Sequence, residues 1–383
     1  MTASLQIKNN KYYVVVQWKP EGGKRKQKWV GTKLTVDGNN KRKAEQMRLE
    51  ILNEYREKIA LNDNDMLFSD YLIKWLEETK TNISENTYFS YRQTITNSIC
   101  PYFKERKIKL CDLRGYQIQG FYNAELNRGV SANTIHHYHA NIHKALKHAV
   151  KTERLKVNPA DKVDLPKKEK HIANFYNLEE LKELLNKSKG TQLEPVINLA
   201  VWFGLRRGEI IGLKWEHIDF ERKILIVAGT VTDKGASGSR IENMKYRASA
   251  KTISSIRSFA LTDDMVNYFK TLRANQLRRQ NQPNYNKQWV DFVCVRDNGD
   301  LVPLDYVTRA FPRFLKQNGL KPIKLHELRH SNISLLLESG ASMKEVQEWA
   351  GHSTYQTTAN IYAHLQAKNK AKLSNTISNL LSS

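Results

Sequence analysis

Apolar residues near position 70 recur at the spacing of one helix face, and this pattern is the strongest constraint on the fold. The positions i, i+3, i+4, i+7 and i+8 are occupied by Phe68, Tyr71, Leu72, Trp75 and Leu76. Further helical patterns follow at 84–99, 116–127 and 131–152, where Ser131 is placed to cap the last helix. The pattern predicts a wholly helical unit over residues 63–160.

A different pattern precedes this unit. The stretch "KYYVVVQW" is rich in β-formers, "EGGKRK" supplies a turn and "KQKWVGTKL" returns, before a basic helix over roughly 40–60. Residues 1–60 hold 14 Lys and Arg against 6 Asp and Glu, a net charge of +8. A solvated surface explains such charge, but basic side chains interleaved with aromatic ones on a sheet suit a DNA groove better. We therefore expect residues 1–62 to form a three-stranded sheet plus a helix that binds DNA.

The third region begins after a linker. Residues 161–172 belong to a charged, proline-containing stretch, which predicts the linker there. Asn177 and Glu180 then form a capping-box pattern that opens a domain over 173–383. Helical patterns dominate it, and β-prone runs occur at 223–229, 251–261 and 289–295. The predicted fold class is a multidomain, mainly α protein with small β-sheets (α+β).

The charge of the whole chain points to a polyanionic partner. The 383 residues carry a formal net charge of +23 and a pI of about 9.7. Nucleic acid is the favoured partner over an acidic membrane surface, because we find no apolar run of about 18 residues and no signal peptide. Three scattered cysteines, Cys100, Cys111 and Cys294, give neither a disulfide framework nor metal-binding spacing.

The stretch "HELRH" at 326–330 matches the HExxH pattern of zinc proteases. His326 and His330 would be the ligands, with Glu345 or Glu348 as a third. The same helix, however, places His326 and Arg329 on one face, where a guanidinium would repel a metal cation. A second pair at i, i+4, His139 and His143, has no carboxylate or thiol nearby in the sequence to complete a shell. We therefore predict no metal site.

Other stretches carry residues suited to phosphate chemistry. In "WFGLRRGEIIGLKWEHIDF", at 202–220, Arg206 stands at a turn into a helix, and Glu209 is placed to orient a basic neighbour. In "AGHSTYQTTANIYAHL", at 350–365, a helix ends at Gly351 and presents His352, and the next helix brings in Tyr362. Lys251 begins a predicted hairpin strand in "AKTISSIRSFAL".

Together these motifs resemble the tyrosine recombinases, the phage-integrase family. That family has an Arg in a GLR-x-GE context, a hairpin Lys, an HxxR box, a GH box and a terminal YxH tyrosine. All occur here in the same order, as Arg206, Lys251, His326 with Arg329, His352 and Tyr362. The resemblance covers essentially the whole chain. Within the family, the chain resembles integrases of Gram-positive temperate phages and integrative conjugative elements.

The resemblance implies a cleavage chemistry that suits these residue types. Arg206 and Arg329 would bind the non-bridging oxygens of the scissile phosphate, and Tyr362 would attack phosphorus to form a 3′-phosphotyrosyl intermediate. Lys251 would be the general acid for the departing 5′ hydroxyl, although Lys234 and Lys245 lie in the same loop region. No cofactor is required.

The remaining two residues act on protons and hydrogen bonds in this scheme. His326 would serve as general base or proton shuttle, because histidine titrates near neutral pH. His352 would hydrogen-bond the scissile phosphate. Arg207 neighbours Arg206, but the GLR register favours Arg206.

The resemblance also implies partners and a place in the cell. We expect double-stranded DNA, bound at core sites by the helical and catalytic domains and at arm sites by residues 1–62. Integration or excision of a mobile element, such as a viral genome, would need a homotetramer on DNA in the bacterial cytoplasm, and an excisionase and a host DNA-bending protein are further candidate partners. A type IB topoisomerase or a non-catalytic DNA-binding protein remains the alternative.

Overall fold

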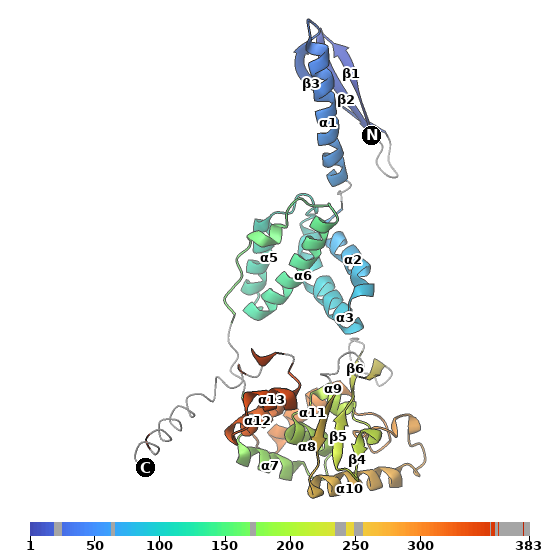
Figure 1. The fold of residues 1–383 in the computed structure, drawn as a ribbon, viewed down its shortest axis with the longest axis vertical. Coiled ribbons are helices and arrows are strands. Elements are labelled where there is room, and N and C mark those ends of the chain that lie inside the picture. Colours follow the sequence, from blue (N-terminus) through green and yellow to red (C-terminus); the bar gives the residue numbers. More distant parts are fainter. Residues whose placement is uncertain are drawn as a thin grey trace. The chain divides into compact units, whose positions relative to one another are not determined.

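The computed structural model describes residues 1–18, 25–62, 66–168, 174–233, 243–248, 256–352, 354–356, 359 and 378, the side chains of 56–62 excepted. The chain divides into two compact units, Met1–Lys170 and His171–Ser383. Figure 1 labels most of their helices and strands. None of the helices in the described part combines the length and apolar composition that crossing a membrane requires.

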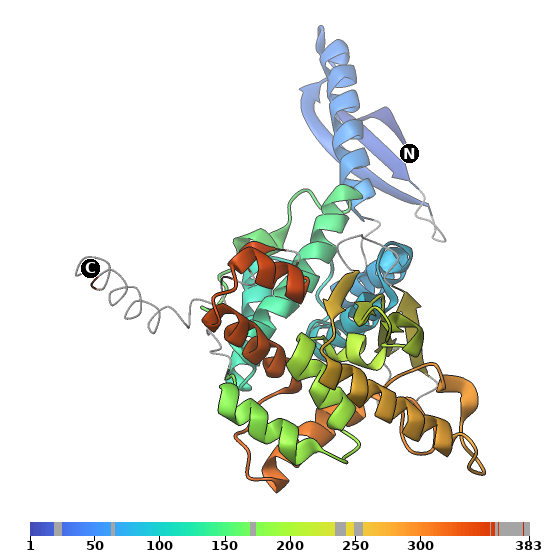
Figure 2. The same cartoon turned by 60° about the horizontal axis from the view of Figure 1, so that its bottom comes forward.

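The chain begins with the predicted three-stranded sheet. Its antiparallel strands, in the order β1-β2-β3, are β1 (Thr2–Lys8), β2 (Lys11–Trp18) and β3 (Lys26–Thr35). Helix α1 (Asn40–Asn62) lies along one face of the sheet, as both Figure 1 and Figure 2 show. Val14 and Val16 are fully buried and form a small core with Ile51 of α1. The sheet-plus-helix prediction is confirmed.

A helical bundle follows in the same unit. Its elements are α2 (Phe68–Thr79), α3 (Glu85–Thr94), a π-helical turn (Ile95–Ile99), α4 (Cys100–Glu105), α5 (Gly115–Asn127) and α6 (Ala132–Lys151). The apolar stripe predicted for α2 is buried at every position in this core. Ser131 caps α6 by accepting a hydrogen bond from the Thr134 N–H at 3.2 Å, as predicted. The boundary drawn near residue 62 and the DNA-binding roles of the two parts stay predictions.

In its described residues, the second unit is a helical domain with two small sheets. Its helices are α7 (Leu178–Ser188), α8 (Glu194–Phe203), α9 (Arg207–Ile211), α10 (Asp263–Arg279), α11 (Leu304–Gln317), α12 (Leu325–Glu338) and α13 (Met343–Ala350). One sheet contains β4 (Ile218–Asp219), β5 (Ile224–Val227) and β8 (Arg257–Ala260), and the other pairs β6 (Gly229–Asp233) with β7 (Met244–Ala248). Helix α8 is buried along most of its length and packs against α12. The Asn177–Glu180 capping box is present at the start of α7.

The predicted strand at 289–295 is wrong. Residues Lys287–Trp289 form a single 3₁₀ turn, and the run contributes only isolated bridges, Lys214 to Phe292 and Val295 to Leu301. Val293 and Cys294 are almost completely buried. The apolar run therefore reflects burial in the core without a strand ladder, since β-propensity largely measures how a side chain packs.

β5 and β8 overlap the other two β-prone runs, 223–229 and 251–261. β5 pairs antiparallel with β8, in the register Ile224 to Ala260. Between them in the chain lies the unpredicted β6–β7 pair, whose mixed polar sequences "GTVTD" and "MKYRA" lack a strong β signal.

Candidate active site

The turn from α8 into α9 places Arg206 at the start of a helix. Gly204 ends α8 with a left-handed φ of 60°, and a Cβ there would lie 2.9 Å from the Asn332 side-chain oxygen. Arg206 is the N-cap of α9, and its N–H donates to Glu209 Oε2 at 2.9 Å. The GLR sequence thus folds as a turn that needs glycine and projects an arginine from the helix N-terminus.

Glu209 is the anionic centre of the site. Its carboxylate receives Arg206 Nη1 at 2.9 Å and Arg257 Nη2 at 2.8 Å, with its side chain only 12% exposed. Burial opposes ionisation of Glu209, but the hydrogen bond and charge of Arg257, with those of Arg206, outweigh it and lower its pKa to about 2. The carboxylate is ionised at neutral pH and fixes two guanidinium groups.

Arg329 of α12 approaches the same place from the interior. It is 1% exposed and donates from Nη1 to the Gly204 carbonyl at 2.6 Å and from Nη2 to the Ala350 carbonyl. Burial lowers its pKa to about 9, and the charge of Arg206 contributes, so the group stays cationic at neutral pH. Arg329 therefore joins the ends of α8 and α13.

The end of α13 completes the cluster. Gly351 terminates the helix with a left-handed φ of 62°, as the sequence predicts, and its carbonyl accepts from Arg206 Nη2 at 2.9 Å. His352 follows and is half-buried. Burial, then the positive charges of Arg329 and Arg206, lower the pKa of His352 to about 4, so the imidazole is neutral at physiological pH.

His326 lies one turn before Arg329 on α12. Its ring is partly open to solvent, yet packing around it lowers its pKa, and the charges of Arg329 and Arg206 lower it further. His326 and Arg329 lie three residues apart on α12, the spacing of one helix face. Arg206, His326, Arg329 and His352 thus share one region of the domain.

A zinc site at His326 and His330 would need a third protein ligand beside them. The His326 and His330 rings make an edge contact at 5.1 Å between centroids. Among the described residues, no group of three His, Cys, Asp or Glu side chains is arranged to hold a metal ion. In the second histidine pair, His139 forms a hydrogen bond with the Tyr122 hydroxyl at 3.0 Å, and His143 forms one with Asp161 at 2.8 Å.

Two predicted residues, Lys251 and Tyr362, lie outside the described residues, as does the alternative acid Lys234. Lys245 is exposed on β7. Arg207 donates to the Leu304 carbonyl at 3.3 Å and to the Thr308 hydroxyl, whereas Arg206 binds Glu209. The two neighbouring arginines therefore have different partners: Arg206 binds Glu209 within the cluster, and Arg207 binds the first turn of α11.

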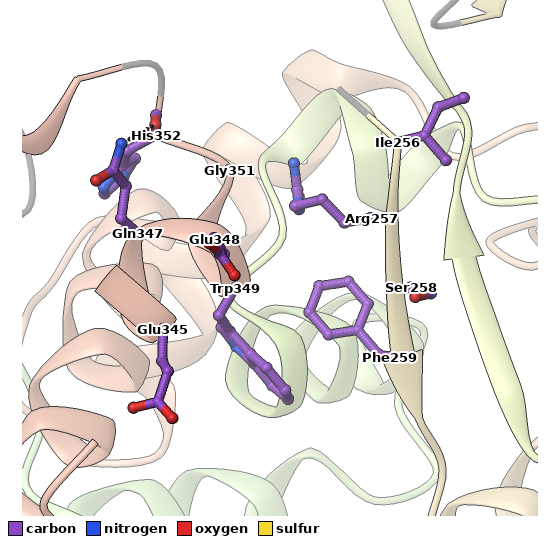
Figure 3. Close-up of a pocket in the computed structure, with 10 residues that line it drawn as sticks. All are labelled: Ile256, Arg257, Ser258, Phe259, Glu345, Gln347, Glu348, Trp349, Gly351 and His352. Carbon is purple, nitrogen blue, oxygen red and sulfur yellow. Dashed lines mark hydrogen bonds between the residues drawn. The ribbon is translucent and has the colours of Figure 1, made fainter. Parts of the chain in front are cut away.

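Sequence reasoning missed Arg257. This side chain of β8 is 7% exposed and forms a two-pronged ion pair with Glu209, Nη2 to Oε2 at 2.8 Å and Nη1 to Oε1 at 3.3 Å. Figure 3 shows it directed from the strand toward Gly351 across a cleft of about 640 Å³ that Trp349 and His352 also line. Arg257 and buried Phe259 lie two residues apart on one face of the strand, but this spacing does not identify the partner of Arg257.

Comparison with known proteins identifies the family. The family model described as "Phage integrase family" matches residues 174–369, and one described as "Phage integrase, N-terminal SAM-like domain" matches residues 67–126. The chain belongs to the phage integrase family. It is therefore a tyrosine recombinase, of the family that cleaves and religates DNA.

Individual relatives agree over most of the chain. A "Tyrosine recombinase XerC-like" protein of Caldanaerobacter subterraneus is 28% identical over 360 residues, covering 90% of this recombinase and 90% of the relative. The Tn1549 transposon integrase, solved in complex with transposon right end DNA, superposes with a TM-score of 0.67 at 18% identity, over 81% of this chain and 99% of that one.

A third match covers still more of the recombinase. The lambda integrase tetramer bound to a Holliday junction gives a TM-score of 0.56 at 17% identity, over 93% of this chain and 94% of that one. At these identities the two structural matches establish a shared fold.

Proposed function

We propose that this recombinase integrates and excises a mobile genetic element through a 3′-phosphotyrosyl intermediate, with Tyr362 as nucleophile. The observation that carries the proposal is the convergence of Arg206 and Arg329 on consecutive carbonyls at the Gly351 turn, beside His352. Two guanidinium groups at one place match the two non-bridging oxygens of a phosphodiester.

The proposed reaction conserves the phosphodiester energy. The Tyr362 oxygen forms a bond to phosphorus while the bond to the 5′ oxygen breaks, and Lys251 gives its proton to that departing oxygen. Arg206 and Arg329 neutralise charge on the equatorial oxygens, where loss of one such donor costs roughly 10²- to 10³-fold in rate. The neutral imidazole of His326 accepts the tyrosine proton, and His352 donates a hydrogen bond to the phosphate. Rejoining reverses these steps with a new 5′ hydroxyl.

The DNA partners are part of the same proposal. Residues 63–160 and the catalytic domain, 173–383, bind the core site, residues 1–62 bind an arm site, and 161–172 link them. The net charge of +23 supports binding to a polyanion, and the DNA in the Tn1549 complex supports duplex DNA as that partner. The lambda integrase match, a tetramer on a Holliday junction, supports a homotetramer during strand exchange. An excisionase and a host DNA-bending protein are further candidate partners in this proposal.

Covalent trapping tests the proposal. A duplex from the element's own ends, nicked near the cleavage point, releases a short 5′-hydroxyl fragment and traps the enzyme on the 3′ phosphate. We expect a protein–DNA adduct that Tyr362→Phe abolishes while DNA binding persists. An adduct that survives in this variant, or its absence in the wild type, would refute the assignment. Relaxation of arbitrary supercoiled plasmid would favour the topoisomerase alternative.

A further inference from the structure

Three elements of the catalytic unit meet at Arg257. Its guanidinium on β8 pairs with Glu209 of α9, and it also packs against the turn that ends α13. A Cβ added to Gly351 would lie 2.4 Å from Arg257 Nη1, so only glycine leaves room for this side chain. Arg257 therefore touches the glycine whose carbonyl Arg206 binds.

These contacts close a ring of four residues. Arg257 binds Glu209, Glu209 binds Arg206, Arg206 binds the Gly351 carbonyl, and Gly351 packs on Arg257. Each link joins segments that are far apart in the chain, except Arg206 to Glu209. A rotation of the Glu209 carboxylate toward solvent would release Arg206, and Arg257 opposes that rotation by binding both carboxylate oxygens.

We propose that Arg257 is a positioning residue for DNA cleavage, which through Glu209 holds the Arg206 guanidinium where it meets the scissile phosphate. The inference rests on the proposed function. Arg257 is 7% exposed and both of its Nη groups bind the Glu209 carboxylate, so we expect it to act on Arg206 through that carboxylate. Lysine cannot replace it fully, because an ammonium lacks the planar fork that spans two oxygens.

The alternative is that the ion pair only stabilises the fold. A general structural defect slows cleavage of any substrate alike. A misplaced Arg206 instead matters most when the phosphate carries its full negative charge. A methylphosphonate at the scissile position replaces one charged non-bridging oxygen by a methyl group, and therefore leaves less charge for Arg206 to neutralise.

The test compares adduct formation by the wild type, Arg257→Met and Arg257→Lys on the nicked duplex, in single-turnover conditions. We expect Arg257→Met to slow adduct formation by roughly 10- to 100-fold, by analogy with the loss of outer partners that orient metal ligands. Arg257→Lys should recover part of the rate. Arg296→Met is the matched control. Arg257 lies over the Phe259 ring at 5.9 Å and Arg296 over the Tyr306 ring at 4.6 Å, and each has a buried Nε without a hydrogen-bond partner in the described structure.

The decisive readout is the ratio of rates on the two substrates. On the methylphosphonate duplex, the loss caused by Arg257→Met or Arg257→Lys, relative to wild type, should shrink by about tenfold. Adding Glu209→Gln to Arg257→Met should cause no further loss on the phosphate duplex, because both changes break one chain of contacts. Equal losses on both duplexes, or wild-type rates in the variants, would overturn the inference. If the wild type itself forms no adduct, the proposed function fails instead.

Discussion

Arg206 and Arg329 donate hydrogen bonds to consecutive backbone carbonyls, those of Gly351 and Ala350. One arginine starts α9 and the other lies within α12, so their meeting depends on how α13 ends. The two differ sharply in burial, because the Arg206 side chain is 43% exposed and Arg329 is 1% exposed. The partly exposed arginine is free to meet DNA, whereas the buried one also holds the domain together.

That difference predicts opposite balances of stability and activity in the two lysine variants. Arg206→Lys should leave the free energy of unfolding nearly unchanged and slow adduct formation by roughly 10²- to 10³-fold. Arg329→Lys should slow cleavage too, and should also lower the free energy of unfolding by about 1–3 kcal/mol, since one ammonium cannot satisfy both buried carbonyls. Urea unfolding and single-turnover cleavage separate the effects. Equal stability losses in both variants would contradict this account.

Replacing Gly351 by alanine should lower the free energy of unfolding by more than the left-handed backbone conformation alone would cause. Gly319 has a similar φ, 65° against 62°, but a Cβ there meets nothing within 4 Å. Gly319→Ala should therefore lower the free energy of unfolding by only about 1–2 kcal/mol, the cost of the left-handed conformation. Gly351→Ala should lower it further and should also slow cleavage by roughly 10- to 100-fold, as for Arg257→Met, because the new Cβ displaces Arg257. Chemical denaturation of both variants measures the difference. Similar losses of stability in the two variants would show that Arg257 can move aside without destabilising the fold.

The ionisation of Glu209 should make the catalytic unit sensitive to acid. Its pKa falls from 4.5 to about 2 on folding, so its stabilising contribution is complete above about pH 4.5 and is lost as the pH falls toward 2. The shift corresponds to about 3 kcal/mol. Glu209→Gln should be less stable than the wild type by at least this amount at pH 7, and the gap should narrow below pH 4.5.

Urea unfolding at a series of pH values measures that gap. Glu216→Gln is the control, because Glu216 pairs with Lys214 at 3.1 Å at the surface, its side chain 64% exposed. This variant should stay close to the wild type throughout, as exposed ion pairs contribute little. A gap for Glu209→Gln that stays constant down to pH 2 would mean that the carboxylate is not the source of the stability.

The local parts of this arrangement could be predicted from the sequence, whereas the contacts between residues far apart in the chain could not. The turn at Arg206, the glycine end of α13 and the capping box of α7 were predictable, because each depends on residues a few positions apart. Arg257 was not, since its partner Glu209 lies 48 residues away and an arginine in a strand is ordinarily a surface residue. The strand expected at 289–295 failed for a related reason, because an apolar run signals burial and the surrounding fold decides its backbone.

The two histidines of "HELRH" should behave differently, which a shared metal would not allow. His330 has a buried Nδ1 without a hydrogen-bond partner in the described structure, and burial, with the charges of His326 and Arg329, lowers its pKa to about 4. Protonation of His330 therefore opposes folding, and its effect on stability grows as the pH falls from 6.5 toward 4. His330→Phe keeps a ring against His326 and should reduce the loss of stability over this range.

Adduct formation by His330→Phe should persist in EDTA. His326→Phe should instead slow adduct formation by roughly 10²- to 10⁴-fold, because the proton acceptor is lost. Equal inactivation of both variants, together with loss of wild-type cleavage in EDTA that added zinc restores, would establish the metal site instead.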